Sequence, residues 1–151
     1  MEEVLKNWER AKAYTKEYLD AMPEDSYLLK PTPLCRSFAD QMLHLADGNF
    51  SFAALAADVS CPVAFGECEQ GKDKSKANVT KWVMESYDFV IEQLNGLSDD
   101  DFTAVTTLFG RYKMSRRAVF DSLYEHQTHH RGQATVYLRL AGIVPPGQKL
   151  F

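Results

Sequence analysis

The sequence predicts an all-α protein, a four-helix bundle with long crossover connections and a short extended segment before the last helix. Four segments of about 20 residues carry apolar side chains every three or four positions, which is the period of an amphipathic helix. Proline, glycine and acidic clusters interrupt that period between the segments. The chain of 151 residues has the length of one domain, so we expect a single domain over residues 1–151.

The first two helices are separated by prolines. The first is expected over residues 2–22, with apolar residues at helical spacing, and Pro23 ends it. Residues 23–34 contain Pro31 and Pro33 and are expected to form an irregular crossover. The second helix is expected over residues 36–57.

The last two helices each begin at a serine. Residues 58–74 are expected to form a loop, after which Ser75 caps a helix over residues 75–95. Between residues 98 and 114 an acidic turn precedes the β-favouring residues 102–107 and a break at Gly110, a pattern that predicts an extended or hairpin-like connection. Ser115 then caps the last helix, which is expected to end near residue 141.

Composition excludes several classes of protein. Apolar residues make up 45% of the chain, which is too many for a disordered protein. Seventeen basic and 21 acidic residues give a net charge of −4, which disfavours nucleic acid as a partner. No apolar run approaches the roughly 18 residues of a membrane span, and the first residues do not resemble a secretory signal, so we expect a cytoplasmic protein without membrane contact.

The three cysteines predict no disulfide framework. Cys35, Cys61 and Cys68 are odd in number and none belongs to a CxxC pair. We expect free thiols that behave as small apolar residues. Their individual roles are left open.

Histidines supply the strongest chemical signal. Three of the four lie within residues 126–130. At about 100° per residue, His126 and His130 fall on the apolar stripe of the last helix, four positions apart, so both imidazoles could bind one metal ion. His129 lies about 80° off that stripe, and we expect it to support the site from outside or to face solvent. The glutamate of the HExxH motif is missing, so no general base accompanies the pair.

The fourth histidine, His44, lies on the edge of the apolar stripe of the second helix. Three histidines from two packed helices form a known catalytic arrangement that leaves a coordination position open for substrate. Asp47 could serve as an oxygen ligand or could orient an imidazole. The alternative is that His126 and His130 are hydrogen-bonded core residues and that His44 lies on the surface. A di-iron site is excluded because the chain contains no ExxH.

The run His129-His130-Arg131-Gly132-Gln133, with the rest of the last helix, resembles the DinB/YfiT-like superfamily of metal-binding four-helix bundles. The connection at Phe109-Gly110 and the second helix around His44 are also similar to that superfamily, so the resemblance spans essentially the whole chain. It implies that His44, His126 and His130 bind a divalent ion, zinc or nickel first, with manganese or iron as further candidates. It also implies a homodimer. Arg131 and Gln133 match the run after the last ligand, at the rim of the site, and Gly132 would allow a close helix contact.

The resemblance favours an enzyme with a small-molecule substrate. It implies a thiol S-transferase in which the metal activates a low-molecular-weight thiol such as bacillithiol, mycothiol or glutathione. A metal-dependent hydrolase is the second interpretation, and a non-catalytic, stress-related metal-binding bundle is the third. No catalytic residue beyond the ligands is identified. The basic cluster formed by Arg111, Lys113, Arg116 and Arg117 could suggest nucleic-acid binding, but the net charge of −4 favours a solvated face.

Overall fold

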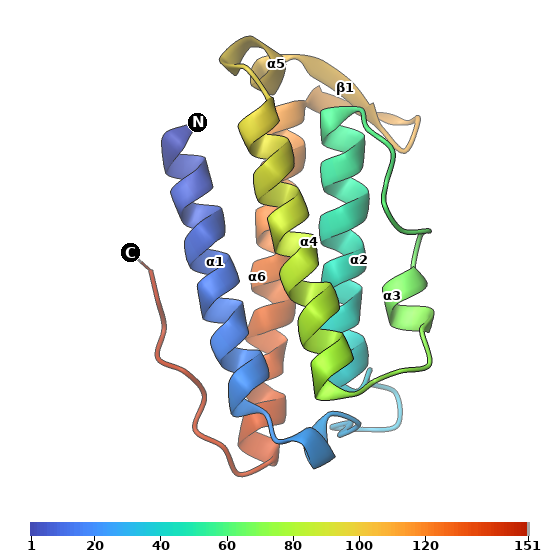
Figure 1. Cartoon of the computed structure of the whole chain (residues 1–151), viewed down its shortest axis with the longest axis vertical. Helices are drawn as coiled ribbons and strands as arrows, with labels where there is room; N and C mark the ends of the chain where they lie inside the picture. The colour runs from blue at the N-terminus through green and yellow to red at the C-terminus, as the bar shows by residue number, and fades with distance from the viewer. Residues whose placement is uncertain (151) are drawn as a thin grey trace.

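Four long helices form the body of the protein (Figure 1). The structure, a computed structural model, describes residues 1–150. The long helices are α1 (Glu2–Ala21), α2 (Phe38–Ala57), α4 (Lys76–Gly96) and α6 (Arg116–Leu140). This arrangement confirms the predicted all-α bundle, and each long helix lies within two residues of its predicted bounds.

Serine side chains fix the starts of three long helices. The hydroxyl oxygens of Ser37, Ser75 and Ser115 each accept the backbone N–H three residues later, at the N-termini of α2, α4 and α6. Such N-caps satisfy backbone donors that have no partner inside the helix. Ser75 and Ser115 are the caps that the sequence predicts. Ser37 shortens the second helix, which was expected to begin at residue 36.

Each long helix packs on two others. Helix α2 packs against α4 and α6, and α1 packs against the same two helices from the other side. Helices α2 and α4 run in the same direction, so the chain must return along the bundle between them (Figure 1). That long crossover was expected to be a loop throughout, but it contains the short helix α3 (Glu67–Gln70). The first crossover likewise contains a 3-10 turn, η1 (Glu24–Ser26).

The connection before α6 is part helix and part hairpin. Strands β1 (Val105–Leu108) and β2 (Tyr112–Ser115) pair antiparallel, with Leu108 opposite Tyr112. Three residues, Phe109, Gly110 and Arg111, connect the strands; Phe109 and Gly110 both have positive φ, and the N–H of Arg111 donates to the carbonyl oxygen of Leu108. Phe102 and Thr103 were expected to be extended but belong to the short helix α5 (Asp99–Thr103). The cause is a capping box between Ser98 and Asp101, together with burial of the Phe102 ring against Phe120.

The core runs the length of the bundle and includes the fully buried side chains of Trp8, Tyr87 and Leu123. All three cysteines are free, as predicted, but only Cys68 is buried; Cys35 is half-buried and Cys61 is exposed. The small apolar role expected of all three therefore fits Cys68 alone. None of the helices within residues 1–150 is long and apolar enough to cross a membrane.

Candidate metal centre

Packing of α2 against α6 brings three histidines together. His44 comes from α2, and His126 and His130 come from α6. One ring nitrogen from each residue can be chosen so that the three nitrogens lie within 4.8 Å of one another. The spacing of four residues on α6 places the two imidazoles on one face, as the periodicity of the sequence indicates. The structure thus supplies the juxtaposition, while the role of these residues as ligands stays a prediction.

Burial keeps two of the rings neutral. His130 is only 5% exposed and His126 is half-buried. Loss of hydration, together with a smaller contribution from the neighbouring imidazoles, lowers the pKa of His126 to about 4 and that of His130 to about 3. A neutral imidazole retains a lone pair, so neither ring has to lose a proton before it binds a metal ion at neutral pH.

These lowered pKa values predict that the metal-free protein loses stability in acid. The unfolded chain holds histidines with a pKa near 6.5, about the ordinary value, whereas the folded chain holds them at about 4 and about 3. Between these values the unfolded state binds more protons, so the free energy of unfolding falls as the pH drops from about 6.5 to about 4. Urea denaturation of chelator-treated protein at a series of pH values measures this slope. In the variant His126→Phe/His130→Leu the free energy of unfolding should depend clearly less on pH. An unchanged dependence would show that these two histidines do not have lowered pKa values in the folded protein.

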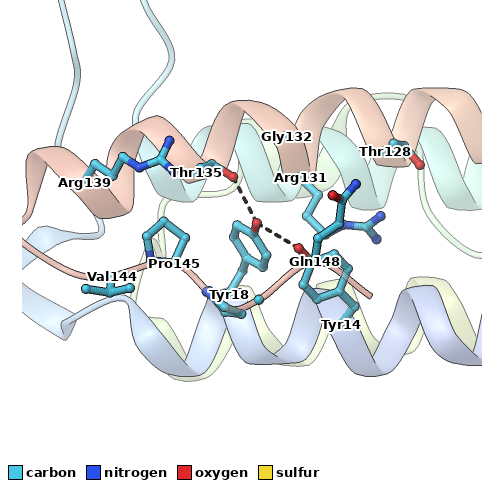
Figure 2. A pocket seen from close by; sticks show the side chains of 12 residues that line it. Tyr14, Tyr18, Thr128, Arg131, Gly132, Thr135, Arg139, Val144, Pro145 and Gln148 are labelled. Carbon is cyan, nitrogen blue, oxygen red and sulfur yellow. Dashed lines mark hydrogen bonds between the residues drawn. The ribbon is translucent and has the colours of Figure 1, made fainter. Parts of the chain in front are cut away.

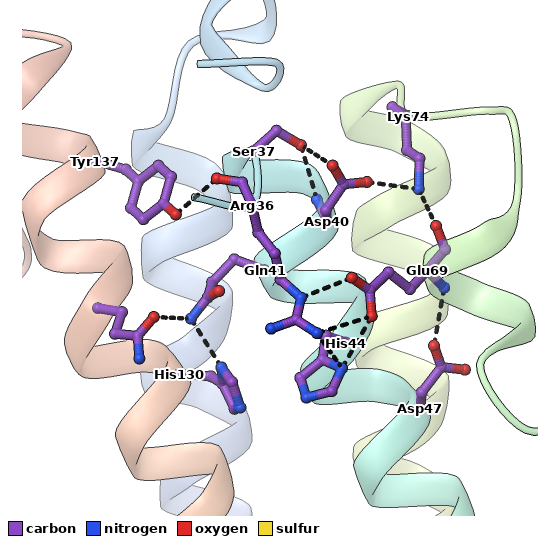
Figure 3. Close-up of polar contacts among 11 residues, drawn as sticks. Arg36, Ser37, Asp40, Gln41, His44, Asp47, Glu69, Lys74, His130 and Tyr137 are labelled. Atoms are coloured by element: carbon purple, nitrogen blue, oxygen red, sulfur yellow. Dashed lines mark hydrogen bonds and ion pairs between the residues drawn. The ribbon is translucent and has the colours of Figure 1, made fainter. Parts of the chain in front are cut away.

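Glu69 and Arg36 hold the His44 ring (Figure 3). The Glu69 carboxylate accepts the Nδ1–H of His44 at 2.9 Å, and the other carboxylate oxygen accepts the Nε–H of Arg36 at 2.6 Å. A carboxylate on Nδ1 fixes the tautomer that leaves the Nε2 lone pair free for a metal ion. Sequence reasoning missed Glu69, because it lies 25 positions from His44 in a segment without helical period.

Asp47 lies outside the histidine cluster. Its two carboxylate oxygens accept the backbone N–H groups of Cys68 and Glu69 at 3.0 and 2.9 Å. The carboxylate is therefore occupied by the start of α3, which corrects the expectation of an oxygen ligand. It orients an imidazole only indirectly, because it anchors the short helix that carries Glu69.

Two amides connect His130 to His129. Gln41 Nε2 lies 2.8 Å from His130 Nδ1 and donates to Gln133 Oε1, while Gln133 Nε2 lies next to His129 Nε2. With this orientation the proton of neutral His130 stays on Nε2. Rotation of both amides by about 180° lets Gln41 Oε1 accept a hydrogen bond from the Nδ1–H of His130. The Nε2 lone pair of His130 is then free, so metal binding through Nε2 requires the rotated orientation. Gln133 and the exposed His129 thus lie beside the cluster, connected to His130 through Gln41, and their support of a metal site stays a prediction.

Gly48 of α2 leaves the space that the His126 ring occupies. A Cβ atom on Gly48 would lie 2.4 Å from Cε1 and 2.7 Å from Nδ1 of the His126 ring. That Nδ1 is buried and has no hydrogen-bond partner within residues 1–150. Buried polar atoms normally have a partner, and an orphaned imidazole nitrogen beside two other imidazoles fits a metal ion as the missing one.

Two expectations for the run after His130 need correction. Gly132 was expected to allow a close helix contact, but a Cβ atom there would meet no heavy atom within 4 Å. Gly48 makes the close approach instead. Arg131 was expected at the rim of the metal site, but its guanidinium group points to α1, where it contacts Thr15. It therefore lies on a different side of α6 from the imidazoles.

A pocket of about 270 Å³ opens next to the cluster. His44 and His126 form part of its wall. The rest includes the guanidinium group of Arg36 and the aromatic rings of Phe52 and Phe65. A small molecule in this pocket would contact the histidines on one side and apolar rings on the other.

The fold and the site together define a four-helix bundle with a cluster of three histidines, two of which, His44 and His126, line a small pocket. The chain belongs to the DinB family, whose model matches residues 1–150. A curated relative, the uncharacterized protein YjoA of Bacillus subtilis, is 27% identical over 129 residues, which cover 85% of this chain and 82% of YjoA.

Solved structures share the fold. A DinB-like protein from Bacillus cereus superposes with a TM-score of 0.86 at 21% identity, over 99% of this chain and 97% of that protein. The crystal structure of YjoA gives a TM-score of 0.74 at 19% identity, over 99% and 96% of the two chains. YfiT from Bacillus subtilis, described as a probable metal-dependent hydrolase with an unusual four-helix bundle topology, gives 0.69 at 16% identity, over 93% and 87%.

Proposed function

We propose that His44, His126 and His130 hold a divalent metal ion and that the protein is a metal-dependent enzyme acting on a small molecule. The observation that carries this proposal is the cluster of three imidazoles, two of which line a pocket. Three imidazole nitrogen donors suit zinc, nickel, iron or copper and leave a position open for a reactant. The preference for zinc or nickel and the homodimer stay predictions from the family resemblance.

Among reactions, we propose transfer of a low-molecular-weight thiol to a small electrophile. When bound, a divalent metal ion would lower the pKa of a thiol and so supply a nucleophile at neutral pH. The carboxylates nearest the cluster are already occupied, Glu69 by His44 and Arg36, and Asp47 by backbone N–H groups. A site without a free general base suits a thiol, whose pKa near 8.5 is about seven units below that of water.

The pocket walls fit both reactants of such a transfer. Arg36 is paired with Glu69 through Nε and Nη2, but its Nη1 has no acceptor within residues 1–150 and could donate to a carboxylate of an anionic thiol. Phe52 and Phe65 supply apolar surface for the electrophile, and Phe65 is 81% exposed, so it can contact a molecule that enters from solvent. The chain thereby binds and orients both molecules beside the imidazoles.

Hydrolysis is the second candidate. It is supported by the likeness in fold to YfiT, which is described as a probable metal-dependent hydrolase. An open three-histidine site can also ionise a water molecule, so the donor set suits this reaction too.

Cobalt-substituted protein distinguishes the candidates. We expect glutathione, cysteine or a related thiol to change the visible spectrum of the Co²⁺-loaded protein through a new sulfur ligand, and His130→Ala to show no such change. The hydrolase would replace the transferase as the better interpretation under two conditions. The spectrum would not change when thiols are added, and the protein would cleave a p-nitrophenyl ester in a reaction that is lost in His130→Ala. If the protein binds Co²⁺ but shows neither response, the site is non-catalytic.

A further inference from the structure

A second cavity lies on the α1 side of α6 (Figure 2). It has a volume of about 500 Å³, and its walls come from α1, α6 and the segment 144–148 after α6. None of the three histidines lines it. It is therefore separate from the pocket of the proposed metal centre.

A buried arginine without an acidic partner forms part of its wall. Arg131 is only 8% exposed. Its Nη1 donates to Gln127 Oε1 at 2.8 Å and to Thr15 Oγ1 at 3.3 Å, and its guanidinium group lies over the Tyr14 ring, 4.5 Å from the ring centre. All of these contacts are neutral. Within residues 1–150 no carboxylate lies within ion-pair distance of Arg131.

The two other nitrogens of Arg131 remain available to a ligand. The hydrogen bonds of the guanidinium group all use Nη1, so Nε and Nη2 have no acceptor in the described part of the chain, and neither is closed off from solvent. Arginine stays charged at every ordinary pH, and a buried charge normally has a counter-charge. The pair Nε and Nη2 matches two oxygens of a carboxylate or phosphate group.

The remaining walls are positive or neutral. Arg139 lies eight residues further along α6, about 12 Å away, and forms no ion pair within residues 1–150. The hydroxyls of Tyr14 and Tyr18 border the same cavity, and Tyr18 is hydrogen-bonded to Thr135. No aspartate or glutamate lines it. The cavity thus combines positive charge with hydroxyl groups and has no negative charge of its own.

We propose that this cavity binds a small organic anion whose carboxylate or phosphate group pairs with Arg131. The volume exceeds what a bare inorganic ion fills, and Val144 and Pro145 offer apolar surface for the rest of the molecule. The site does not depend on the proposed metal centre, because Arg131 and His130 face different helices.

The test uses benzoate, phenyl phosphate and the uncharged benzamide as probes at constant ionic strength. Calorimetry should show that the wild-type protein binds one of the two anions at least about tenfold more tightly than benzamide, and the preferred anion identifies the oxyanion. Amide NMR shifts should change at Gly132 and Gly147, which border the cavity. Equal binding of benzoate, phenyl phosphate and benzamide, or no binding, would overturn the proposal, as would shifts confined to Gly48 in the other pocket.

Three variants locate the charge that matters. Arg131→Lys keeps a cation but loses the paired donors, and affinity for the preferred anion should fall at least about tenfold. Arg139→Gln removes an exposed charge and should weaken binding by a smaller factor, which keeps the proposal testable if the Arg131 variant does not fold. Arg117→Gln is the matched control, because Arg117 lies on α6 outside the cavity and pairs with Asp121. If Arg131→Lys and Arg139→Gln both bind the anion as Arg117→Gln does, the assignment is wrong.

Discussion

Substitution of His130 by alanine is expected to abolish stoichiometric metal binding while the bundle stays folded. Loss of one of three ligands should weaken metal affinity by more than about 100-fold, because loss of a supporting group outside the ligand set already costs about 10- to 100-fold. The fold should survive, since the neutral ring makes one side-chain hydrogen bond, to Gln41, whose loss costs about 1–3 kcal/mol. Elemental analysis of purified protein measures metal content, and circular dichroism measures helicity.

The matched control for this substitution is His129→Ala. It removes an imidazole from the next position of α6, where the ring is exposed and contacts Gln133. This variant should retain close to one metal ion per chain. Full metal occupancy in His130→Ala would show that the three-histidine assignment is wrong, and equal loss in both variants would point to a general effect of weakening α6.

Replacement of Gly48 by alanine should damage the metal site without changing any proposed ligand. The added Cβ atom would lie 2.4 Å from Cε1 of His126, so the imidazole would have to move out of its position. A shift of about 1 Å exceeds what a preorganised site tolerates, and metal affinity should fall at least about tenfold. Stability should change little, because the gain of about 1 kcal/mol from replacing a helical glycine offsets part of the strain.

Gly132→Ala provides the comparison. The same substitution is made in the middle of α6, two positions after His130, where the new Cβ atom meets no heavy atom within 4 Å. It should raise the free energy of unfolding by up to about 1 kcal/mol and leave metal affinity unchanged. If Gly48→Ala binds metal as tightly as Gly132→Ala does, then His126 does not bind the ion from the place it occupies in the structure.

The sequence predicts the four helices well because each signal is local. Apolar residues at steps of three and four define the long helices, and Ser75 and Ser115 begin two of them by capping. The same periodicity places His126 and His130 on one face of α6. The departures have local causes as well: Phe102 favours an extended chain by propensity, yet the capping box at Ser98 and burial of its ring hold it in α5.

The residues that surround the three histidines could not be predicted from local sequence patterns, because their positions depend on contacts between distant segments. Glu69 reaches His44 only because α3 packs on α2, and nothing in residues 58–74 has a period that predicts this packing. Gly48 is one glycine in a helix, and only the position of α6 shows that a Cβ atom there would strike His126. The anion-binding role proposed for Arg131 likewise depends on contacts with α1, which supplies neutral partners and no carboxylate.

The anchoring of α3 by Asp47 divides the second crossover into two parts that can vary independently. The hydrogen bonds to the N–H groups of Cys68 and Glu69 fix the later part relative to α2, whatever the length of chain before it. The earlier part, residues 58–66, carries Phe65 at the wall of the pocket. Doubling the length of such a loop costs only about 0.6 kcal/mol in closure entropy. Insertions and deletions there can therefore reshape the entrance for a substrate while the carboxylate that orients His44 stays in register.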